Sequence, residues 1–207
     1  MYQCIKRVAD IVIAAIAVVI LCPLFLIIWL AIRLGSPGLT IFKQQRAGKN
    51  GVGFTFYKFR TMRTDVDSFG PSPKSGKDAR LTKVGRLLRE HSLDELPQLV
   101  NVLKGDMSIV GPRPLYISQM AEWNDRQKRR LLVKPGLTGL AQISGRGALT
   151  IEEKLDLDVR YVDTTGFWLD VKIFFATVAQ VFFKKSIYEK NYSKTESSRG
   201  DKHGKRI

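Results

Sequence analysis

Residues 84–114 read VGRLLREHSLDELPQLVNVLKGDMSIVGPRP, and the interpretation of the whole chain starts from this stretch. Two adjacent carboxylates, Asp94 and Glu95, lie at its centre. A basic segment containing Arg89 precedes them, and Arg113 follows between two prolines that restrict its backbone. Arginine offers a planar fork that matches phosphate oxygens. Arg113 is therefore a candidate phosphate ligand, whereas Arg89 taken alone is more typical of a solvated surface charge.

The spacing of Ser92 and Glu95 is that of a capping box, which predicts a helix start. Pro97 leaves two registers open: it lies inside the helix if Ser92 is the N-cap, and in the first turn if Asp94 is the N-cap. Both registers put the carboxylates at a helix N-terminus, and Gly105 ends the helix. The residues predicted to face a core from this helix are Leu96, Leu99, Val100 and Leu103.

A helix N-terminus favours negative charge, so it would keep the Asp94 carboxylate ionised and could also bind a phosphate. An ionised carboxylate can ligate a hard divalent cation or attack phosphorus. The alternative is that the pair only caps the helix, since acidic residues are common in first turns.

Composition restricts the class of protein. The chain has 207 residues, which suits one catalytic domain with accessory segments. Its two cysteines and two histidines provide neither a disulfide framework nor a zinc motif, so a reduced, cytosol-facing protein is expected. The net charge of +15 calls for acidic partners, namely nucleic acid, anionic lipid or a phosphorylated substrate. No nucleic-acid-binding module is recognisable, which excludes the first.

Residues 11–32 form an uncharged apolar stretch, which as a helix would extend about 33 Å and could span a bilayer. Pro23 near its middle should kink that helix. Lys6 and Arg7 precede the stretch, and only basic charges follow it as far as residue 63. Positive charge on both sides predicts a helix that breaks at Pro23 and returns to the cytoplasmic face. The alternative is a spanning helix that tolerates its proline.

Residues 41–45 and 54–62 predict two strands joined at a Gly-Lys-Asn-Gly turn, with Phe54, Phe56, Lys58 and Arg60 on one face. Residues 64–80 predict a long loop, either a mobile lid or disordered. Further predictions are a surface helix over 115–132, a glycine-rich ligand-binding or turn segment over 134–147, a helix over 152–161, an apolar core or interfacial helix over 167–183, and a disordered tail from Ser193.

Four blocks in this order resemble the monotopic phosphoglycosyl transferases, the bacterial sugar transferase family: SLDELPQL, NVLKGDMS, GPRP and KPGLTGLAQISGR. Phe42, Gln44, Arg46, Gly48 and the block YKFRTM match further family motifs, so the resemblance covers residues 1 to about 185. Two positions depart from the family pattern. Cys22 precedes Pro23 where serine is frequent, and Gly147 follows Arg146 where asparagine is frequent.

The resemblance implies a catalytic site. Asp94 would be the nucleophile, Glu95 its acidic partner, and Lys58 a further member of the site. Arg89, Arg113 and Arg146 are the substrate-binding candidates, of which the resemblance places Arg146 near the nucleotide sugar. Magnesium, with manganese as a substitute, would bind at Asp94 and Glu95, because it takes oxygen ligands and bridges substrate phosphates.

The sequence thus predicts a membrane-associated α+β protein with a re-entrant N-terminal helix in residues 1–36, a small cytosolic catalytic domain with a β-hairpin and interfacial helices in 37–190, and a basic tail in 191–207. The family's reaction transfers a phosphosugar from a UDP-sugar to polyprenyl (undecaprenyl) phosphate through an aspartyl intermediate and releases UMP, as the first membrane step of glycoconjugate synthesis. The expected location is the cytoplasmic face of the bacterial inner membrane.

Two alternatives remain at this point. A non-catalytic peripheral protein could bind anionic lipid through the basic surface, but it would have no use for two carboxylates among cations. Direct transfer without a covalent intermediate would leave Asp94 only as a metal ligand. No sequence feature specifies the sugar or an oligomeric state.

Overall fold

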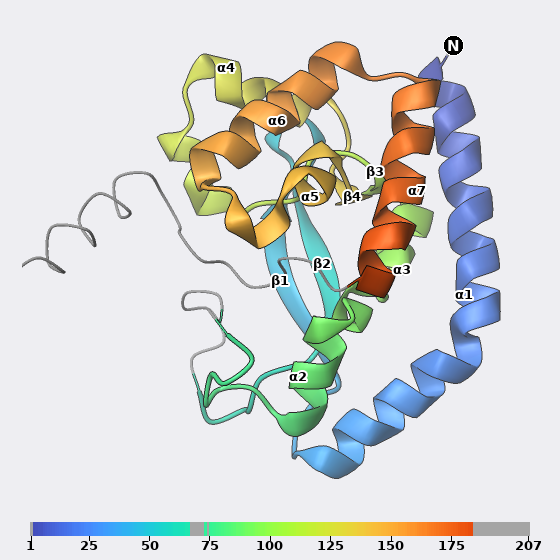
Figure 1. The fold of residues 1–207 in the computed structure, drawn as a ribbon, viewed down its shortest axis with the longest axis vertical. Coiled ribbons are helices and arrows are strands. Elements are labelled where there is room, and N and C mark those ends of the chain that lie inside the picture. The colour runs from blue at the N-terminus through green and yellow to red at the C-terminus, as the bar shows by residue number, and fades with distance from the viewer. Residues whose placement is uncertain (1, 67–72, 74, 184–207) are drawn as a thin grey trace, which may run out of the picture.

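The computed structural model describes residues 2–66, 73 and 75–183 of the chain. It is a mixed helix and sheet structure in which a long N-terminal helix packs along one side of a smaller α+β body (Figure 1). This arrangement confirms the predicted α+β class. The part of the predicted loop that covers residues 67–72 and 74 and the predicted tail lie outside the described residues.

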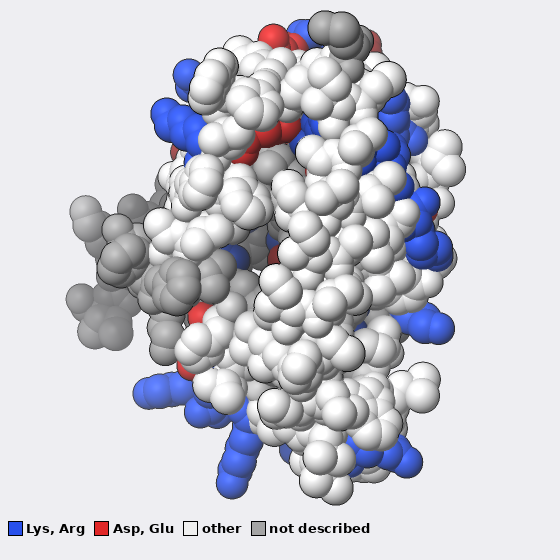
Figure 2. All heavy atoms as spheres, turned by 90° about the vertical axis from the view of Figure 1, so that its right-hand side faces the viewer, with Lys and Arg blue, Asp and Glu red and all other residues white. Residues whose placement is uncertain are grey.

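Helix α1 (Tyr2–Gly35) is continuous and contains Pro23. Figure 1 shows that it changes direction partway along its length, so the predicted break takes the form of a bend inside one helix. The helix is long and apolar enough to cross a membrane by length and composition. Asp10, Ala14, Ile28 and Ile32 are its buried residues. Most of its other large apolar side chains are exposed, and this side of the molecule is a broad uncharged band with basic side chains mostly toward its margins (Figure 2).

The predicted hairpin is present as β1 (Ile41–Ala47) and β2 (Gly53–Phe59), which pair antiparallel with Phe42 opposite Lys58. A short 3₁₀ turn (η1, Lys49–Gly51) joins them. The second strand is shorter than predicted. Beyond Phe59, the Arg60 N–H still donates to the Thr40 carbonyl at 2.8 Å, and Met62 makes only an isolated bridge to Leu81.

The predicted capping box at Ser92 is wrong. After α2 (Lys83–Glu90), Ser92 adopts a left-handed conformation, and Leu93–Glu95 form a 3₁₀ turn (η2). Helix α3 (Gln98–Lys104) begins only after Pro97, which lacks the N–H needed to bond back to the preceding turn. Asp94 and Glu95 therefore lie on a short turn before a helix, in neither predicted register. Gly105 ends α3 in the left-handed conformation, as predicted.

A parallel strand pair escaped the sequence analysis. Strand β3 (Ser108–Val110) pairs with β4 (Gly136–Thr138), which lies inside the glycine-rich segment. A β-carbon added to Gly136 would lie 2.1 Å from the backbone nitrogen of Gly111, so this close approach requires glycine. Gly136 and Gly139 of this segment therefore serve close backbone packing against Gly111.

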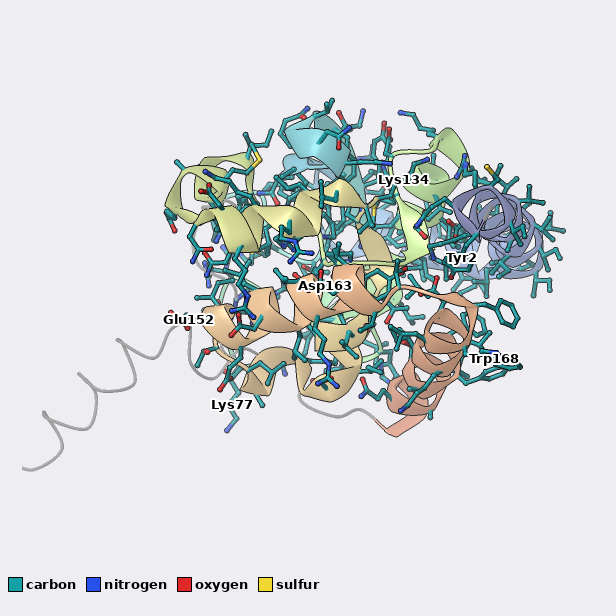
Figure 3. The ribbon with its side chains drawn as sticks, turned by 90° about the horizontal axis from the view of Figure 1, so that it is seen from above. Tyr2, Lys77, Lys134, Glu152, Asp163 and Trp168 are labelled. Carbon is teal, nitrogen blue, oxygen red and sulfur yellow. The ribbon has the colours of Figure 1, made fainter. Side chains whose placement is uncertain are left out.

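The C-terminal half is helical. The predicted surface helix over 115–132 is instead three short segments, η3 (Ile117–Glu122), α4 (Asp125–Lys128) and η4 (Arg129–Leu132). The segments α5 (Leu140–Ser144) and η5 (Arg146–Ala148) follow. The last two predicted helices are confirmed as α6 (Ile151–Thr164) and α7 (Phe167–Phe183). Helix α7 lies beside α1, and Trp168 at its start points outward (Figures 1 and 3).

The main core joins α1, β2, α3, β3, α6 and α7. It contains Ala14, Phe54, Phe56, Leu99, Val102, Met107, Ile109, Val110, Tyr161 and Ile173. Leu99 is buried as predicted, and Leu96 and Leu103 are partly buried. The prediction that Val100 faces the core is wrong, because this side chain is 42% exposed. Each fully buried large side chain contributes about 1.5–3 kcal/mol. The core thereby fixes α3, and with it the turn that carries the two carboxylates.

Candidate active site

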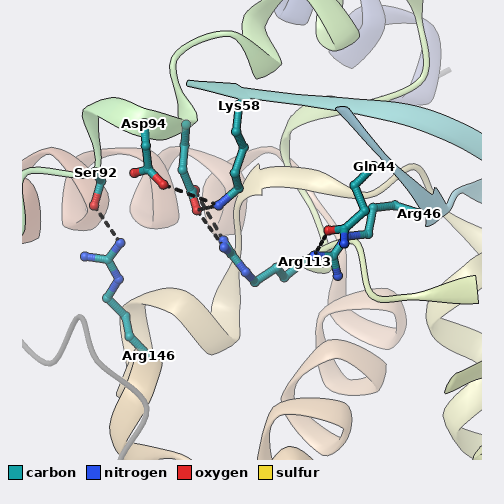
Figure 4. A network of polar contacts seen from close by, with 8 residues as sticks. Gln44, Arg46, Lys58, Ser92, Asp94, Arg113 and Arg146 are labelled. Atoms are coloured by element: carbon teal, nitrogen blue, oxygen red, sulfur yellow. Dashed lines mark hydrogen bonds and ion pairs between the residues drawn. The ribbon is translucent and has the colours of Figure 1, made fainter. Parts of the chain in front are cut away.

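Glu95 binds two cations at once. Its Oε1 accepts hydrogen bonds from Lys58 Nζ at 2.9 Å and from Arg113 Nη2 at 2.6 Å, and its Oε2 lies 3.2 Å from Arg113 Nη1 (Figure 4). The two bonds from Arg113 form the fork geometry of a bidentate pair. Glu95 thus holds the ammonium of β2 and the guanidinium that follows β3 in one cluster.

Asp94 lies at the edge of this cluster and is almost completely buried. Its Oδ2 lies 3.6 Å from Lys58 Nζ. Burial raises the pKa of the Asp94 carboxyl above its ordinary value; the charge of Lys58 opposes this, and the charge of Glu95 adds to it. Burial acts in the same sense on Glu95, but Arg113 and Lys58 outweigh it and hold the Glu95 pKa well below its ordinary value. The two adjacent carboxylates therefore differ strongly in basicity.

Asn101 fixes the distance between the hairpin and the carboxylate turn. From α3, its side-chain amide donates to the Thr55 carbonyl at 2.7 Å and its Oδ1 accepts from the Tyr57 N–H at 3.2 Å. Asn101 is completely buried, so these bonds are shielded from water. They hold Lys58, the next residue of β2, in register with Glu95.

A buried ion pair supports the backbone of Arg113. Arg130 and Asp158 are 2.7 Å apart and both side chains are nearly inaccessible to solvent. The Arg130 guanidinium also donates to the Arg113 carbonyl. Sequence reasoning missed this support, because Arg130 lies in a run of basic residues that reads as solvated surface.

Arg146 contacts the carboxylate turn through Ser92. Its Nη2 donates to the Ser92 hydroxyl at 2.9 Å, and both residues have positive φ angles, 49° and 57°. Such backbone conformations are uncommon outside glycine and cost free energy unless the surroundings stabilise them. Burial lowers the pKa of Arg146, while Glu95 raises it, so the two charges interact. The structure brings Arg146 to the turn that carries the carboxylates.

Arg89 makes the weakest link to the site. It lies half-buried in the last turn of α2, and its positive charge lowers the pKa of Asp94. The structure thus gathers Lys58, Asp94, Glu95 and Arg113 in direct contact, joins Arg146 through Ser92, and connects Arg89 through its electric field.

Arg46 was matched to a family motif but was given no role from the sequence. Its Nη2 donates to Gln44 Oε1 at 2.6 Å, and its guanidinium carbon lies 3.7 Å from the centre of the Tyr116 ring. Burial lowers its pKa to about 10, Tyr116 opposes the shift, and the positive charge of Arg113 adds to it. Figure 4 shows Arg46 and Gln44 beyond Arg113, at the far end of the cluster from Asp94. The alternation of Gln44 and Arg46 along one strand was the available signal.

Of the two predicted magnesium ligands, Asp94 is better placed to bind the ion than Glu95. Within the part of the chain that is described, no group of three or more His, Cys, Asp or Glu side chains could hold a metal ion. Magnesium commonly uses only one or two protein carboxylates and takes its other ligands from substrate phosphates and water. Asp94 can meet that requirement. Both oxygens of Glu95 already lie within hydrogen-bond distance of cationic side chains, so Glu95 would have to release one of them to bind metal.

A buried carboxylate beside a cationic cluster, on a body that packs against a long apolar helix, is an arrangement suited to group transfer at a membrane. Comparison with known proteins gives the family, since the model of the bacterial sugar transferase family matches residues 1–184. The chain belongs to the bacterial sugar transferase family, which confirms the prediction made from its sequence blocks and its assignment as a phosphoglycosyl transferase.

Three relatives are similar over most of this chain. The "Uncharacterized sugar transferase EpsL" of Bacillus subtilis is 49% identical over 177 residues, covering 86% of each chain. The "Galactosyl transferase CpsE" of Streptococcus agalactiae is 46% identical over 156 residues, 70% of this chain and 35% of its own length. A "UDP-glucose:undecaprenyl-phosphate glucose-1-phosphate transferase" of Caulobacter vibrioides is 42% identical over 195 residues, 88% of this chain and 72% of its own. The match thus spans about a third of the Streptococcus protein.

Proposed function

We propose that this chain transfers a sugar 1-phosphate from a UDP-sugar to undecaprenyl phosphate, giving undecaprenyl-diphosphate-sugar and UMP. The observation that carries the proposal is the buried Asp94 beside a cluster in which Glu95 holds Lys58 and Arg113. The relatives' names support the two substrates, and they differ in the sugar.

The first step uses Asp94 as the nucleophile. A carboxylate oxygen of Asp94 forms a bond to the phosphorus that carries the sugar, and the bond from that phosphorus to the oxygen of UMP breaks. The UMP oxygen keeps the electron pair. Lys58 and Arg113 lie where they can neutralise the phosphate oxygens during this exchange. The raised pKa of Asp94 favours this role, because a more basic carboxylate is the better nucleophile of the pair.

The second step regenerates the enzyme. An oxygen of undecaprenyl phosphate attacks the same phosphorus, and the bond to Asp94 breaks to restore the free carboxylate. The lipid phosphate carries negative charge in place of the departed UMP, so the same cations can serve both half-reactions. The exposed apolar side of α1 supports a lipid-linked acceptor, because it would bring the site to the membrane surface where the acceptor's head group lies.

Release of UMP from a panel of UDP-sugars, with and without undecaprenyl phosphate, tests the function. The proposal expects continuous UMP release only with acceptor, and at most one equivalent per enzyme without it. A peripheral lipid-binding protein would release no UMP with any donor. Direct transfer would give continuous release with acceptor but none without it. UDP-glucose and UDP-galactose are the first donors to compare.

Magnesium, or manganese in its place, is proposed as a cofactor held by Asp94 together with the substrate diphosphate. When bound, it would neutralise phosphate charge. Excess chelator should reduce UMP release by more than about 100-fold, because a metal bridge commonly supplies several kcal/mol. Added magnesium or manganese should restore the rate, and added calcium should restore it poorly because of its larger size. Undiminished release in excess chelator would contradict the metal role.

The re-entrant topology is proposed for α1, with the catalytic domain on the cytoplasmic face of the inner membrane. Both ends of the helix contact the same body. Near its start Lys6 binds Asp170 at 2.6 Å, and just beyond its end Arg60 donates to the Ser36 carbonyl at 2.9 Å. A straight spanning helix would put its ends on opposite sides of a core about 30 Å thick. Contacts from both ends to one domain, together with the bend, support a helix that enters and leaves on one side.

Cysteine labelling tests this topology in cells whose inner membrane is intact and can be reached by the reagent from outside. Cys4 is exposed near the start of α1, and Leu39 is 81% exposed beyond its end. Two single-cysteine forms are compared: Cys22→Ser, which keeps Cys4, and Leu39→Cys with Cys4→Ser and Cys22→Ser. Both should react with an impermeant reagent only after the membrane is opened. Reaction of either position from outside before opening would contradict the proposal.

A further inference from the structure

Four polar side chains near the start of α1 point toward the catalytic domain. Tyr2, Lys6 and Asp10 lie four residues apart on one face of the helix and are half-buried or buried, as is Arg7 beside them. Apart from Gln3, the large outward side chains in the same turns are apolar and include Ile5, Val8, Val12 and Ile16. This distribution is the reverse of that on a helix whose charges face solvent.

The first contact joins α1 to α7 and α6. Asp170 Oδ2 accepts hydrogen bonds from Tyr2 Oη at 2.5 Å and Lys6 Nζ at 2.6 Å, while its Oδ1 accepts one from Tyr161 Oη at 2.8 Å. Tyr161 Oη also lies 3.2 Å from the carbonyl oxygen of Val110, the last residue of β3. Figure 3 shows Tyr2 at the junction of α1 with α7.

Two further contacts reach the elements next to the site. Arg7 donates to the carbonyls of Val102 at 2.6 Å and Leu103 at 2.9 Å, in the last turn of α3. The Val102 carbonyl also accepts the Gly105 N–H at 3.1 Å, and a cation beside the carbonyls of a helix C-terminus is favourable. Asp10 accepts the N–H of Ile109 in β3 at 2.9 Å, and both groups are buried.

All three contacts end on or beside α3 and β3. Helix α3 directly follows the turn that carries Asp94 and Glu95, and β3 leads through two residues to Arg113. The first turns of α1 therefore contact both α3, which follows the turn with the two carboxylates, and β3, which leads to Arg113. A small displacement of these elements would change the distance between Glu95 and Arg113.

We infer that Lys6, Arg7 and Asp10 are positioning residues for the transfer reaction, which hold α3 and β3 so that the carboxylate turn and Arg113 stay aligned. The inference rests on the proposed function. This role of Lys6 and Arg7 differs from that of flanking charges that bind lipid head groups or orient the helix. A flanking charge would act from neighbouring exposed positions as well, whereas a positioning charge acts only from positions that reach Asp170 or α3.

Moving one charge along the helix separates these roles. Lys6→Ala removes the charge and the contact. Lys6→Ala with Cys4→Lys restores the charge at an exposed position on the same helix, but not the contact. Both variants should slow the single-turnover release of UMP with donor alone by about 10- to 100-fold, the size expected for a small misplacement. Lys6→Arg should keep most of the rate, and Cys4→Lys alone should match wild type.

Membrane recovery, melting temperature and topology are measured on the same preparations, with topology read from a cysteine at position 39 because two of the variants replace Cys4. We expect wild-type recovery and topology in every variant. Arg7→Gln, which contacts α3 and not Asp170, provides a second variant and should show the same loss of rate. Full rate in both Lys6→Ala and Arg7→Gln, or recovery of the rate by Cys4→Lys, would overturn the inference. The proposed function fails separately, only if wild type releases no UMP.

Discussion

Asp94→Asn should abolish transfer while the protein remains folded. The substitution preserves size but removes the oxygen that would attack phosphorus, so kcat/KM should fall by at least about 10³-fold, or about 4 kcal/mol. Stability should not suffer in proportion, because burial already disfavours the charged form of this carboxyl. Activity assays and thermal melting on the same membrane preparation provide the measurement.

Glu90→Gln is the matched control for Asp94→Asn. Glu90 ends α2 only four residues earlier, and the same loss of one negative charge there should leave the rate near wild type. Wild type treated with donor alone should carry a phosphosugar, and peptide mass spectrometry should map it to Asp94. The Asn variant should carry none. An adduct on another residue, or activity retained in Asp94→Asn, would remove Asp94 from the nucleophilic role.

Glu95→Gln should also be severe and should lower kcat/KM by about 10²-fold, for a different reason. The neutral amide can no longer balance Lys58 and Arg113, so both cations lose the anion that holds them together. The nucleophile stays in place, and an adduct should still form slowly. This separates the two carboxylates: one variant loses the adduct, and the other loses the rate at which it forms.

The pH profile gives a sharper readout for Glu95→Gln. Wild-type kcat/KM should fall as pH drops through the raised pKa of Asp94, because only the ionised carboxylate attacks. The charge of Glu95 contributes to that raised pKa, so its removal should lower the Asp94 pKa and move the acid limb to lower pH. Glu122→Gln, on the exposed η3 segment, should leave the limb unchanged. An unchanged or upward-shifted limb in Glu95→Gln would contradict this electrostatic account.

Local patterns predicted much of the architecture. The hairpin, the two C-terminal helices and the long apolar helix follow from two-residue alternation, turn residues and hydrophobic length, which act over short segments. The register at Ser92 did not follow, because contacts from three residues distant in sequence override the capping box. Arg146 engages the Ser92 hydroxyl and the two cations engage Glu95, so neither side chain caps a helix. The β3–β4 pair was missed because its two strands are three residues each and far apart in sequence.

The site was predicted in its members more than in its geometry. Motif resemblance named Lys58 and the Asp94–Glu95 pair, and side-chain chemistry named Arg113. The structure brings these four residues into one cluster. It did not reveal that Glu95 is committed to two cations, since that depends on how β2 and β3 approach the turn. Supporting residues such as Arg130 and Asn101 were missed for the same reason. Their roles are set by burial and by partners distant in sequence.

The bond between Tyr2 and Asp170 joins residues 168 positions apart, and this has a consequence for biosynthesis. At about 5–20 residues per second, the ribosome adds Asp170 roughly 10–30 s after Tyr2. Lys6 therefore lacks Asp170, and Arg7 lacks the carbonyls of α3, when the start of α1 first meets the bilayer, so both cations can orient the nascent helix as positive flanks. Once α3 and α7 have both emerged, the same charges are drawn into the folded domain. Truncation before Asp170 should accordingly yield a chain that reaches the membrane but in which Tyr2 and Lys6 lack the contact with Asp170.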